Sequence, residues 1–114
     1  MKFTIWHNPR CSKSRETLEV LRSHGIEPEI RLYLTEPPVS SELKEIIDKL
    51  EIEPHELIRK GEEIYKKNYK NKEMKPSDWI DVMAENPVLI ERPIVIKGNK
   101  ARIGRPPDNV LDLI

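Results

Sequence analysis

The first 34 residues alternate between strand-like and helix-like patterns, and this alternation restricts the possible folds more than any other feature. Residues 2–6, KFTIW, are typical of a short β-strand, and residues 12–24 carry apolar side chains at helical spacing. Gly25 follows at the place where a helix commonly ends, and residues 28–34, PEIRLYL, alternate like a second strand. A strand, a helix and a strand in this order predict two parallel strands joined by a right-handed crossover.

The middle of the chain has helical patterns. Ser40 or Ser41 is the predicted cap of a helix whose apolar residues Leu43, Ile46, Ile47 and Leu50 form one stripe. Pro54 fits the first turn of a short helix, and Ser77 is the predicted cap of another, which Pro87 ends. Residues 60–75 are dense in lysine and glutamate, which indicates short helix and loop on the surface.

The last part of the chain returns to strands. Residues 93–104, PIVIKGNKARIG, predict a β-hairpin with a Gly-Asn turn, and a final helix should begin at the following prolines. Within that helix we expect Val110, Leu111 and Ile114 to face inward. The whole pattern predicts an α/β fold, thioredoxin-like in outline: a small mixed four-stranded sheet with flanking helices. A helical insertion separates its β-α-β and β-β-α halves, within a single domain of residues 1–114.

Charge and cysteine usage narrow the class of protein. The chain has 20 Lys and Arg against 20 Asp and Glu, so a formal net charge of zero argues against binding nucleic acid through a basic face. No apolar run approaches the roughly 20 residues of a membrane-spanning helix, and the N-terminus lacks the long apolar stretch of a secretory signal. A single cysteine agrees with a reducing compartment, so we expect a cytoplasmic protein with no membrane partner.

The single cysteine, Cys11, lies where the first helix should begin. Unpaired backbone N–H groups and the helix dipole stabilise an anion at that position, so a thiolate is favoured there. Arg10, Lys13, Arg15 and His7 are close in sequence and add positive charge. The same N–H groups could hold a bound oxyanion such as phosphate or arsenate. A lone cysteine can also be a small buried apolar residue. The three histidines share no ligand-like spacing with Cys11, so we expect no metal site.

The motif around this cysteine is CxxS, with Ser14 where a redox dithiol would have its second thiol. A serine cannot form the internal disulfide that resolves a mixed disulfide. If Cys11 is redox-active, its oxidised or adducted form must therefore be resolved by an external thiol.

These residues resemble the glutaredoxin-coupled arsenate reductases of the thioredoxin-like superfamily. The matching stretches are IWHNPRCSKSRETLEVL, LYLTEPP, ELIRKGEEIY, NPVLIERPIVI and RIGRPPDNVLDLI, and the CSKS motif is similar to that of a short form of the family. The resemblance implies reduction of arsenate to arsenite through a cysteine thiolate adduct. It also implies glutathione as co-substrate, a glutaredoxin as protein partner and no bound cofactor.

The resemblance also implies roles for individual residues. Cys11 would be the catalytic nucleophile, and His7 and Ser14 would tune its thiolate. Three arginines would bind arsenate or a similar oxyanion, and a cis-proline would lie beside the active site: Arg59, Arg92 and Arg105, with Pro93.

Two other functions remain open from the sequence. One is a monothiol, glutathione-linked oxidoreductase with another substrate. The other is a non-catalytic regulator of the same fold that binds RNA polymerase, although Ser14 stands where the redox switch of such relatives has a second cysteine.

Overall fold

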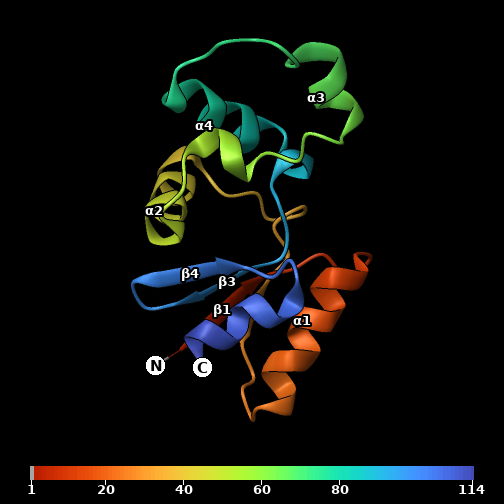
Figure 1. The fold of residues 1–114 in the computed structure, drawn as a ribbon, viewed down its shortest axis with the longest axis vertical. Helices are drawn as coiled ribbons and strands as arrows, with labels where there is room; N and C mark the ends of the chain where they lie inside the picture. Colours follow the sequence, from red (N-terminus) through yellow and green to blue (C-terminus); the bar gives the residue numbers. More distant parts are fainter. Residues whose placement is uncertain (1) are drawn as a thin grey trace. The chain divides into compact units, whose positions relative to one another are not determined.

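The structure is a computed structural model that describes residues 2–114, and these form two compact units (Figure 1). The first unit comprises residues 2–36 and 92–114, and the second comprises residues 37–91. The first unit contains a four-stranded sheet of order β2-β1-β3-β4. Its strands are β1 (Phe3–Trp6), β2 (Glu29–Arg31), β3 (Ile94–Lys97) and β4 (Lys100–Ile103).

The sheet is mixed, as the sequence predicts. Strand β1 pairs with β2 in parallel and with β3 in antiparallel, and β3 pairs with β4 in antiparallel. Helix α1 (Ser12–Ser23) connects β1 to β2 and ends before Gly25, whose φ of +77° favours glycine. The predicted β-α-β unit, its helix and the hairpin are therefore confirmed.

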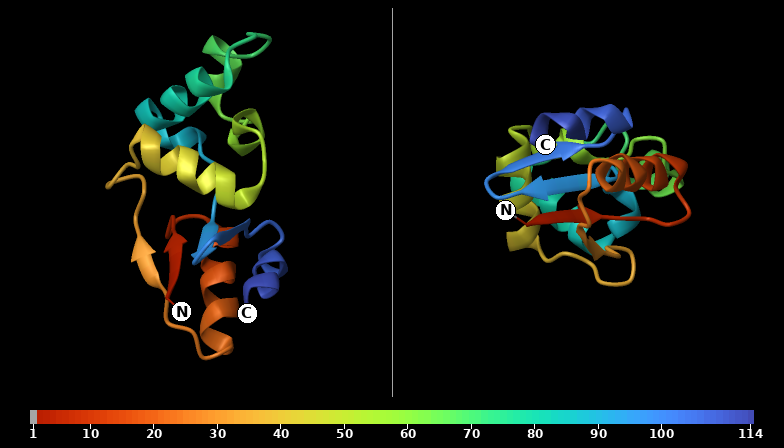
Figure 2. Two further views of the ribbon diagram at one scale, coloured as in Figure 1. Left: turned by 90° about the vertical axis from the view of Figure 1, so that its left-hand side faces the viewer. Right: turned by 90° about the horizontal axis from the view of Figure 1, so that it is seen from below.

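The core of this unit lies on one face of the sheet. Helix α1 and the C-terminal 3-10 helix η3 (Pro107–Leu113) both pack there, as the two views of Figure 2 show. The side chains buried between them come from strands, α1 and η3: Phe3, Ile5, Leu18, Leu21, Val95, Val110 and Leu113.

The inward face of η3 differs from the prediction. Val110 and Leu113 are buried, whereas Leu111 and Ile114 are 41% and 47% exposed. The prediction assumed α-helical spacing, but a 3-10 helix has three residues per turn, so positions i and i+3 share a face. Leu113 therefore takes the buried position that was assigned to Ile114.

Strand β2 is shorter than the predicted segment 28–34. Strand β1 ends at Trp6, which pairs with Arg31, so the edge strand has no partner beyond that residue. The chain turns instead, with the N–H groups of Thr35 and Glu36 donating to the Leu32 carbonyl at 3.0 and 2.8 Å. The side chains of Leu32 and Leu34 are left exposed.

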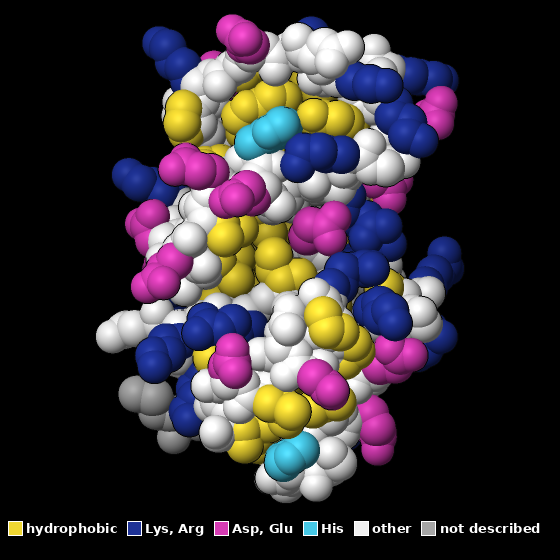
Figure 3. Space-filling view, viewed as in Figure 1, with side chains coloured by type: hydrophobic (Ala, Val, Ile, Leu, Met, Phe, Trp, Pro, Cys, Tyr) yellow, Lys and Arg dark blue, Asp and Glu magenta, His cyan; other side chains and the backbone are white. Residues whose placement is uncertain are grey.

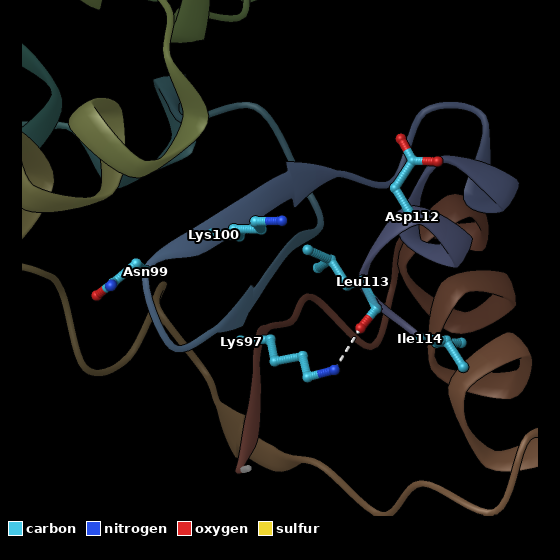
Figure 4. A pocket seen from close by; sticks show the side chains of 6 residues that line it. All are labelled: Lys97, Asn99, Lys100, Asp112, Leu113 and Ile114. Carbon is cyan, nitrogen blue, oxygen red and sulfur yellow. Dashed lines mark hydrogen bonds between the residues drawn. The ribbon is translucent and has the colours of Figure 1, made fainter.

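The hairpin and the C-terminal segment meet at the end of the sheet opposite to the start of α1. Lys97 Nζ donates to the Leu113 carbonyl at 2.9 Å (Figure 4). The side chain of Lys97 also lies over the Phe3 ring, with 5.2 Å between Nζ and the ring centroid. A hollow of about 370 Å³ lies here, lined in part by Asn99, Lys100 and Asp112.

The second unit is helical. It contains α2 (Ser40–Leu50), η1 (Pro54–Leu57), α3 (Glu63–Asn68), α4 (Pro76–Glu85) and η2 (Pro87–Leu89). Helix α4 packs against α2, η1 and η2. His55 stacks on Trp79 with ring centroids 4.6 Å apart, and its Nε2 lies 2.9 Å from the Tyr65 hydroxyl. The helices predicted near Ser40, Pro54 and Ser77 are present as α2, η1 and α4.

The predicted caps of α2 and α4 are wrong by one or two positions. Val39 and Lys75 occupy the N-cap positions, and their N–H groups donate to the carboxylates of Glu42 and Asp78 at 3.2 Å. Each carboxylate accepts the N–H of the cap residue itself, which is one half of a capping box, and neither Val39 nor Lys75 offers a side-chain acceptor to the first turn. Ser40 is already helical, and its hydroxyl donates to Asp81 Oδ1 at 2.8 Å.

The surface mixes charges of both signs. On the face shown in Figure 3, lysine and arginine side chains lie among aspartates and glutamates. Within residues 2–114, no helix combines the length and apolar character needed to cross a membrane.

Candidate active site

One edge of the sheet brings together three segments that are far apart in sequence. Trp6, the last residue of β1, pairs with Ile94, the first residue of β3, and Ile94 pairs in turn with Ile103, the last residue of β4. The loop 7–10 that precedes α1, Arg92 just before β3, and Arg105 just after β4 must therefore emerge at the same edge.

Cys11 is the N-cap residue of α1. Its backbone is extended, with φ −96° and ψ 123°, and its N–H donates to the Asn8 carbonyl at 3.0 Å. Its own carbonyl accepts the N–H of Arg15 at 3.0 Å and so closes the first turn of the helix. The thiol is free and partly buried. The predicted position of this thiol, at the start of the first helix, is confirmed.

The surroundings of Cys11 lower the pKa of its thiol. Partial burial alone would raise the pKa. Three groups outweigh it: the backbone N–H of Ser14, the Arg92 guanidinium and the N–H of Lys13. The guanidinium acts both as a hydrogen-bond donor and through its positive charge. The helix start thus stabilises the thiolate as predicted. The charge comes from Arg92, whereas the prediction named cations next to Cys11 in sequence.

Two of those neighbouring cations are engaged elsewhere. Lys13 Nζ pairs with Glu16 at 3.4 Å, and Arg15 Nη1 donates to the Pro9 carbonyl at 2.9 Å. Closeness in sequence could not identify Arg92, because Arg92 reaches the thiol only through the pairing of β1 with β3.

Arg105 is the second guanidinium at the thiol. Its Nη2 lies 3.5 Å from Cys11 Sγ, and its Nε donates to the Arg92 carbonyl at 2.7 Å. The backbone of Arg92 therefore orients Arg105 toward the sulfur. The peptide bonds Arg92–Pro93 and Arg105–Pro106 are both cis, so Pro93 is the cis-proline that the family resemblance implies.

A buried hydrogen-bond donor of Arg92 is the next feature of the site. Its Nε is buried and has no hydrogen-bond partner among the described residues. A buried N–H of a guanidinium is costly without an acceptor. An oxyanion bound beside Cys11 would supply one, because guanidinium groups match tetrahedral oxyanions well.

His7 and Ser14 form a buried pair behind the helix start. His7 Nδ1 lies 2.6 Å from Ser14 Oγ, which also accepts the N–H of Asn8 at 3.0 Å. Burial lowers the pKa of His7, and the positive charges of Arg22 and Arg15 add to this effect. A neutral His7 that accepts the Ser14 hydroxyl proton at Nδ1 satisfies both groups. The pair links loop 7–8 to the helix; that it tunes the thiolate stays a prediction.

Arg59 lies in the second unit, two residues after the end of η1. Its N–H donates to the Leu89 carbonyl at 2.7 Å, and its Nε faces Glu62 Oε1 at 3.4 Å. The predicted role of Arg59 in oxyanion binding also stays a prediction. Among the described residues, no group of three His, Cys, Asp or Glu side chains could hold a metal ion.

A tight contact that sequence reasoning missed supports this arrangement. A Cβ added to Gly104 would lie 2.5 Å from Thr17 Oγ1 and 2.8 Å from Pro93 Cγ. Thr17 is fully buried, and its hydroxyl lies 2.8 Å from the Lys13 carbonyl and 3.4 Å from the Gly104 carbonyl. A glycine directly before an arginine was the only sequence signal. The contact brings the segment before Arg105 against α1.

Fold and site together define a thioredoxin-like protein with one activated thiol at a helix start, flanked by two arginines. The chain belongs to the ArsC family, whose sequence profile matches residues 6–113. It is 46% identical to the uncharacterized protein YfgD of Escherichia coli, over 96% of this chain and 94% of that protein.

Two further relatives carry a functional name. The chain is 45% identical to a Haemophilus influenzae protein named arsenate reductase, over the full length of both. A solved structure named arsenate reductase from Vibrio cholerae superposes with a TM-score of 0.96 at 43% identity, covering 100% of this chain and 98% of that one. The predicted family and fold class are confirmed.

Proposed function

We propose that this chain is an arsenate reductase in which Cys11 is the nucleophile and glutathione and a glutaredoxin supply the electrons. The observation that carries the proposal is the thiol at the start of α1, with Arg105 Nη2 at 3.5 Å and with Arg92 Nε buried without a hydrogen-bond partner within residues 2–114. The names of relatives 45% and 43% identical over essentially their whole length support the choice of substrate.

The first step is attack on arsenate. The Cys11 thiolate forms a bond to arsenic, and one oxygen of arsenate leaves as water after taking up protons. Arg92 and Arg105 neutralise the negative charge of the oxyanion, and the N–H groups of Lys13 and Ser14 add fixed donors. The family resemblance adds Arg59 to these arginines.

The reduction itself takes two electrons, which two external thiols supply on forming a disulfide. Glutathione replaces a second oxygen on arsenic, which again leaves as water. A glutaredoxin thiolate then attacks the glutathione sulfur, and the electron pair of the broken sulfur–arsenic bond stays on arsenic, which becomes As(III). Water finally displaces Cys11 and arsenite leaves. Because these thiol reductants belong to reducing compartments, we place the reaction in the cytoplasm.

The test is arsenite production by the purified protein with arsenate, glutathione and a glutaredoxin. We expect turnover in the complete mixture and none with Cys11→Ser, whose size is close to that of the natural residue. Arg92→Ala, Arg105→Ala and Arg59→Ala should each raise the KM for arsenate or lower kcat.

A second measurement separates substrate binding from turnover. Arsenate at saturating concentration should slow alkylation of Cys11 by iodoacetamide, because it occupies the space in front of the thiolate. Arsenite formation by Cys11→Ser, or a complete mixture that forms none with the unaltered protein, would overturn the proposal.

A further inference from the structure

A groove of about 400 Å³ runs along the loop that leads into Cys11. Asn8, Pro9 and Arg10 line one side of it, and Leu32, Leu34 and Thr35 line the other. The second side exists because β2 ends at Arg31 and the chain then turns without a strand partner. All of these residues belong to the first unit.

The groove and the thiol lie at the same edge of the sheet. Trp6 pairs with both Arg31 and Ile94, so the segments that follow β1 and β2 emerge next to the segment that precedes β3. The arginines approach Cys11 from the side of β3 and β4. The groove borders the same loop on the side of β2. In the strand order β2-β1-β3-β4, this is the side of β1 that faces away from β3 and β4.

The lining of the groove combines apolar surface with a single full charge. Leu32 and Leu34 are 37% and 41% exposed and supply the apolar part of the lining. Arg10 is exposed at the rim, and the lowered pKa of His7 leaves that residue neutral. The groove is thus complementary to a small molecule with an anionic end and a largely uncharged body.

We propose that this groove binds glutathione, with a carboxylate of the peptide at Arg10 and its backbone along Leu32 and Leu34. This inference rests on the proposed function, because that reaction requires a thiol brought to the arsenic on Cys11. Glutathione is an anionic tripeptide of a size that a groove in the ordinary range of small-molecule sites accommodates. Bound here, its thiol arrives from the flank that the arginines leave open.

The kinetic test uses charge reversal and an acidic side chain in the groove, each with a matched control. Arg10→Glu and Leu34→Glu should raise the KM for glutathione about fivefold, the size expected for exposed charge contacts. Lys100→Glu makes the same charge change at the hairpin, and Leu111→Glu alters a leucine that is also 41% exposed. Both controls should leave that KM within about twofold of the unaltered protein.

The KM values for the other reactants decide between occupants. Glutathione binding predicts that the KM for arsenate and the KM for glutaredoxin stay unchanged in Arg10→Glu and Leu34→Glu. An unchanged KM for glutathione with a raised KM for glutaredoxin would overturn the inference and assign the groove to protein docking. Equal effects from the control variants Lys100→Glu and Leu111→Glu would overturn it as well, because the response would then reflect overall charge.

A binding measurement without arsenate keeps this inference separate from the proposed function. S-methylglutathione cannot react with Cys11, so its titration into the ¹⁵N-labelled protein reports binding alone. We expect amide shifts at Asn8, Arg10, Leu34 and Thr35 that Arg10→Glu abolishes. Shifts confined to other regions, or none, would overturn the inference even if arsenite forms. Shifts in the groove without arsenite formation would leave it standing and remove the proposed function.

Discussion

The reactivity of Cys11 depends on donors from two distant parts of the chain. The N–H groups of Ser14 and Lys13 belong to its own helix, whereas Arg92 arrives with the strand that pairs beside β1. Together they overcome the effect of partial burial and lower the pKa of the thiol. Helix dipole and guanidinium act on the same atom, so removing one leaves the other in place.

We therefore predict that Arg92→Gln raises the pKa of Cys11 without abolishing its reactivity. The rate of iodoacetamide alkylation, measured against pH, should reach its half-maximum at a higher pH than in the unaltered protein. Arg102→Gln is the control, since Arg102 pairs with Asp112 at 3.5 Å instead. An Arg92→Gln profile that coincides with the profile of the unaltered protein would show that the helix start alone sets the pKa.

The buried His7 makes the free energy of unfolding depend on pH. Burial lowers the pKa of His7 below its ordinary value of 6.5, so the unfolded chain binds this proton more readily than the folded chain. The stabilisation is complete above pH 6.5 and is lost as the pH falls through the lower pKa of the folded protein. His55, whose pKa is lowered mainly by desolvation and then by Lys60, acts in the same direction.

The urea midpoint of unfolding should accordingly fall when the pH is lowered from 7 to 5. His7→Asn should be less stable at pH 7, by about 1–2 kcal/mol for the lost hydrogen bond to Ser14. Its midpoint should also change less with pH than that of the unaltered protein. If the urea midpoint of His7→Asn changes with pH as much as that of the unaltered protein, a group other than His7 is responsible.

At the scale of secondary-structure elements, the contact between α1 and the end of β4 positions Arg105. We predict that Gly104→Ala destabilises the protein by about 1–3 kcal/mol, because the new methyl group would overlap Thr17 and Pro93. The displaced segment should also move Arg105 from the thiol and raise the pKa of Cys11. The alkylation profile measures this second effect separately from stability.

A compensating variant tests the cause. Thr17→Ala removes the two atoms that a Cβ at position 104 would approach at 2.5 and 3.0 Å. The double variant Gly104→Ala with Thr17→Ala should recover part of the low thiol pKa that Gly104→Ala alone loses, since the contact with Pro93 Cγ at 2.8 Å remains. If the double variant is as impaired as the single one, overlap with Thr17 is not the reason.

The elements were predictable from local patterns, and the errors have local physical causes. Apolar spacing and the Gly-Asn turn predicted α1 and the β3–β4 hairpin because these features need no distant partner. The predicted serine caps were wrong because both helices begin before their serines, at cap residues whose own N–H groups donate to Glu42 and Asp78. The prediction of the inward face of η3 was wrong because a 3-10 helix repeats every three residues, and the spacing of apolar residues alone did not distinguish it from an α-helix.

The site was predictable only in part for a related reason. The position of Cys11 follows from where α1 begins, which is a local property. Arg92 and Arg105 were assigned through the family resemblance, and their approach to Cys11 depends on strand pairing. The Thr17–Gly104 contact spans 87 positions in sequence, and no pattern in a single sequence encodes it.

For the molecule as a whole, one cooperative domain over residues 1–114 remains a prediction. Each of the two compact units holds roughly 55–60 residues, a size at which a single core is marginal. We expect one thermal transition in which the calorimetric and van't Hoff enthalpies agree. Two resolved transitions would show that the units unfold independently.

The chain as a whole carries one cysteine, and this determines which reductant it can use. No second thiol within these 114 residues can attack an adduct on Cys11, and the Ser14 hydroxyl is held between His7 and the Asn8 N–H. Thioredoxin reduces disulfides, and this chain cannot form one internally. Glutathione with a glutaredoxin should therefore sustain arsenite production, whereas thioredoxin with its reductase should give less than about a tenth of that rate. Mass spectrometry should find the adduct in which arsenic bridges the Cys11 sulfur and the glutathione sulfur when the glutaredoxin is withheld. Full turnover with thioredoxin alone would refute the dependence on an external glutathione thiol.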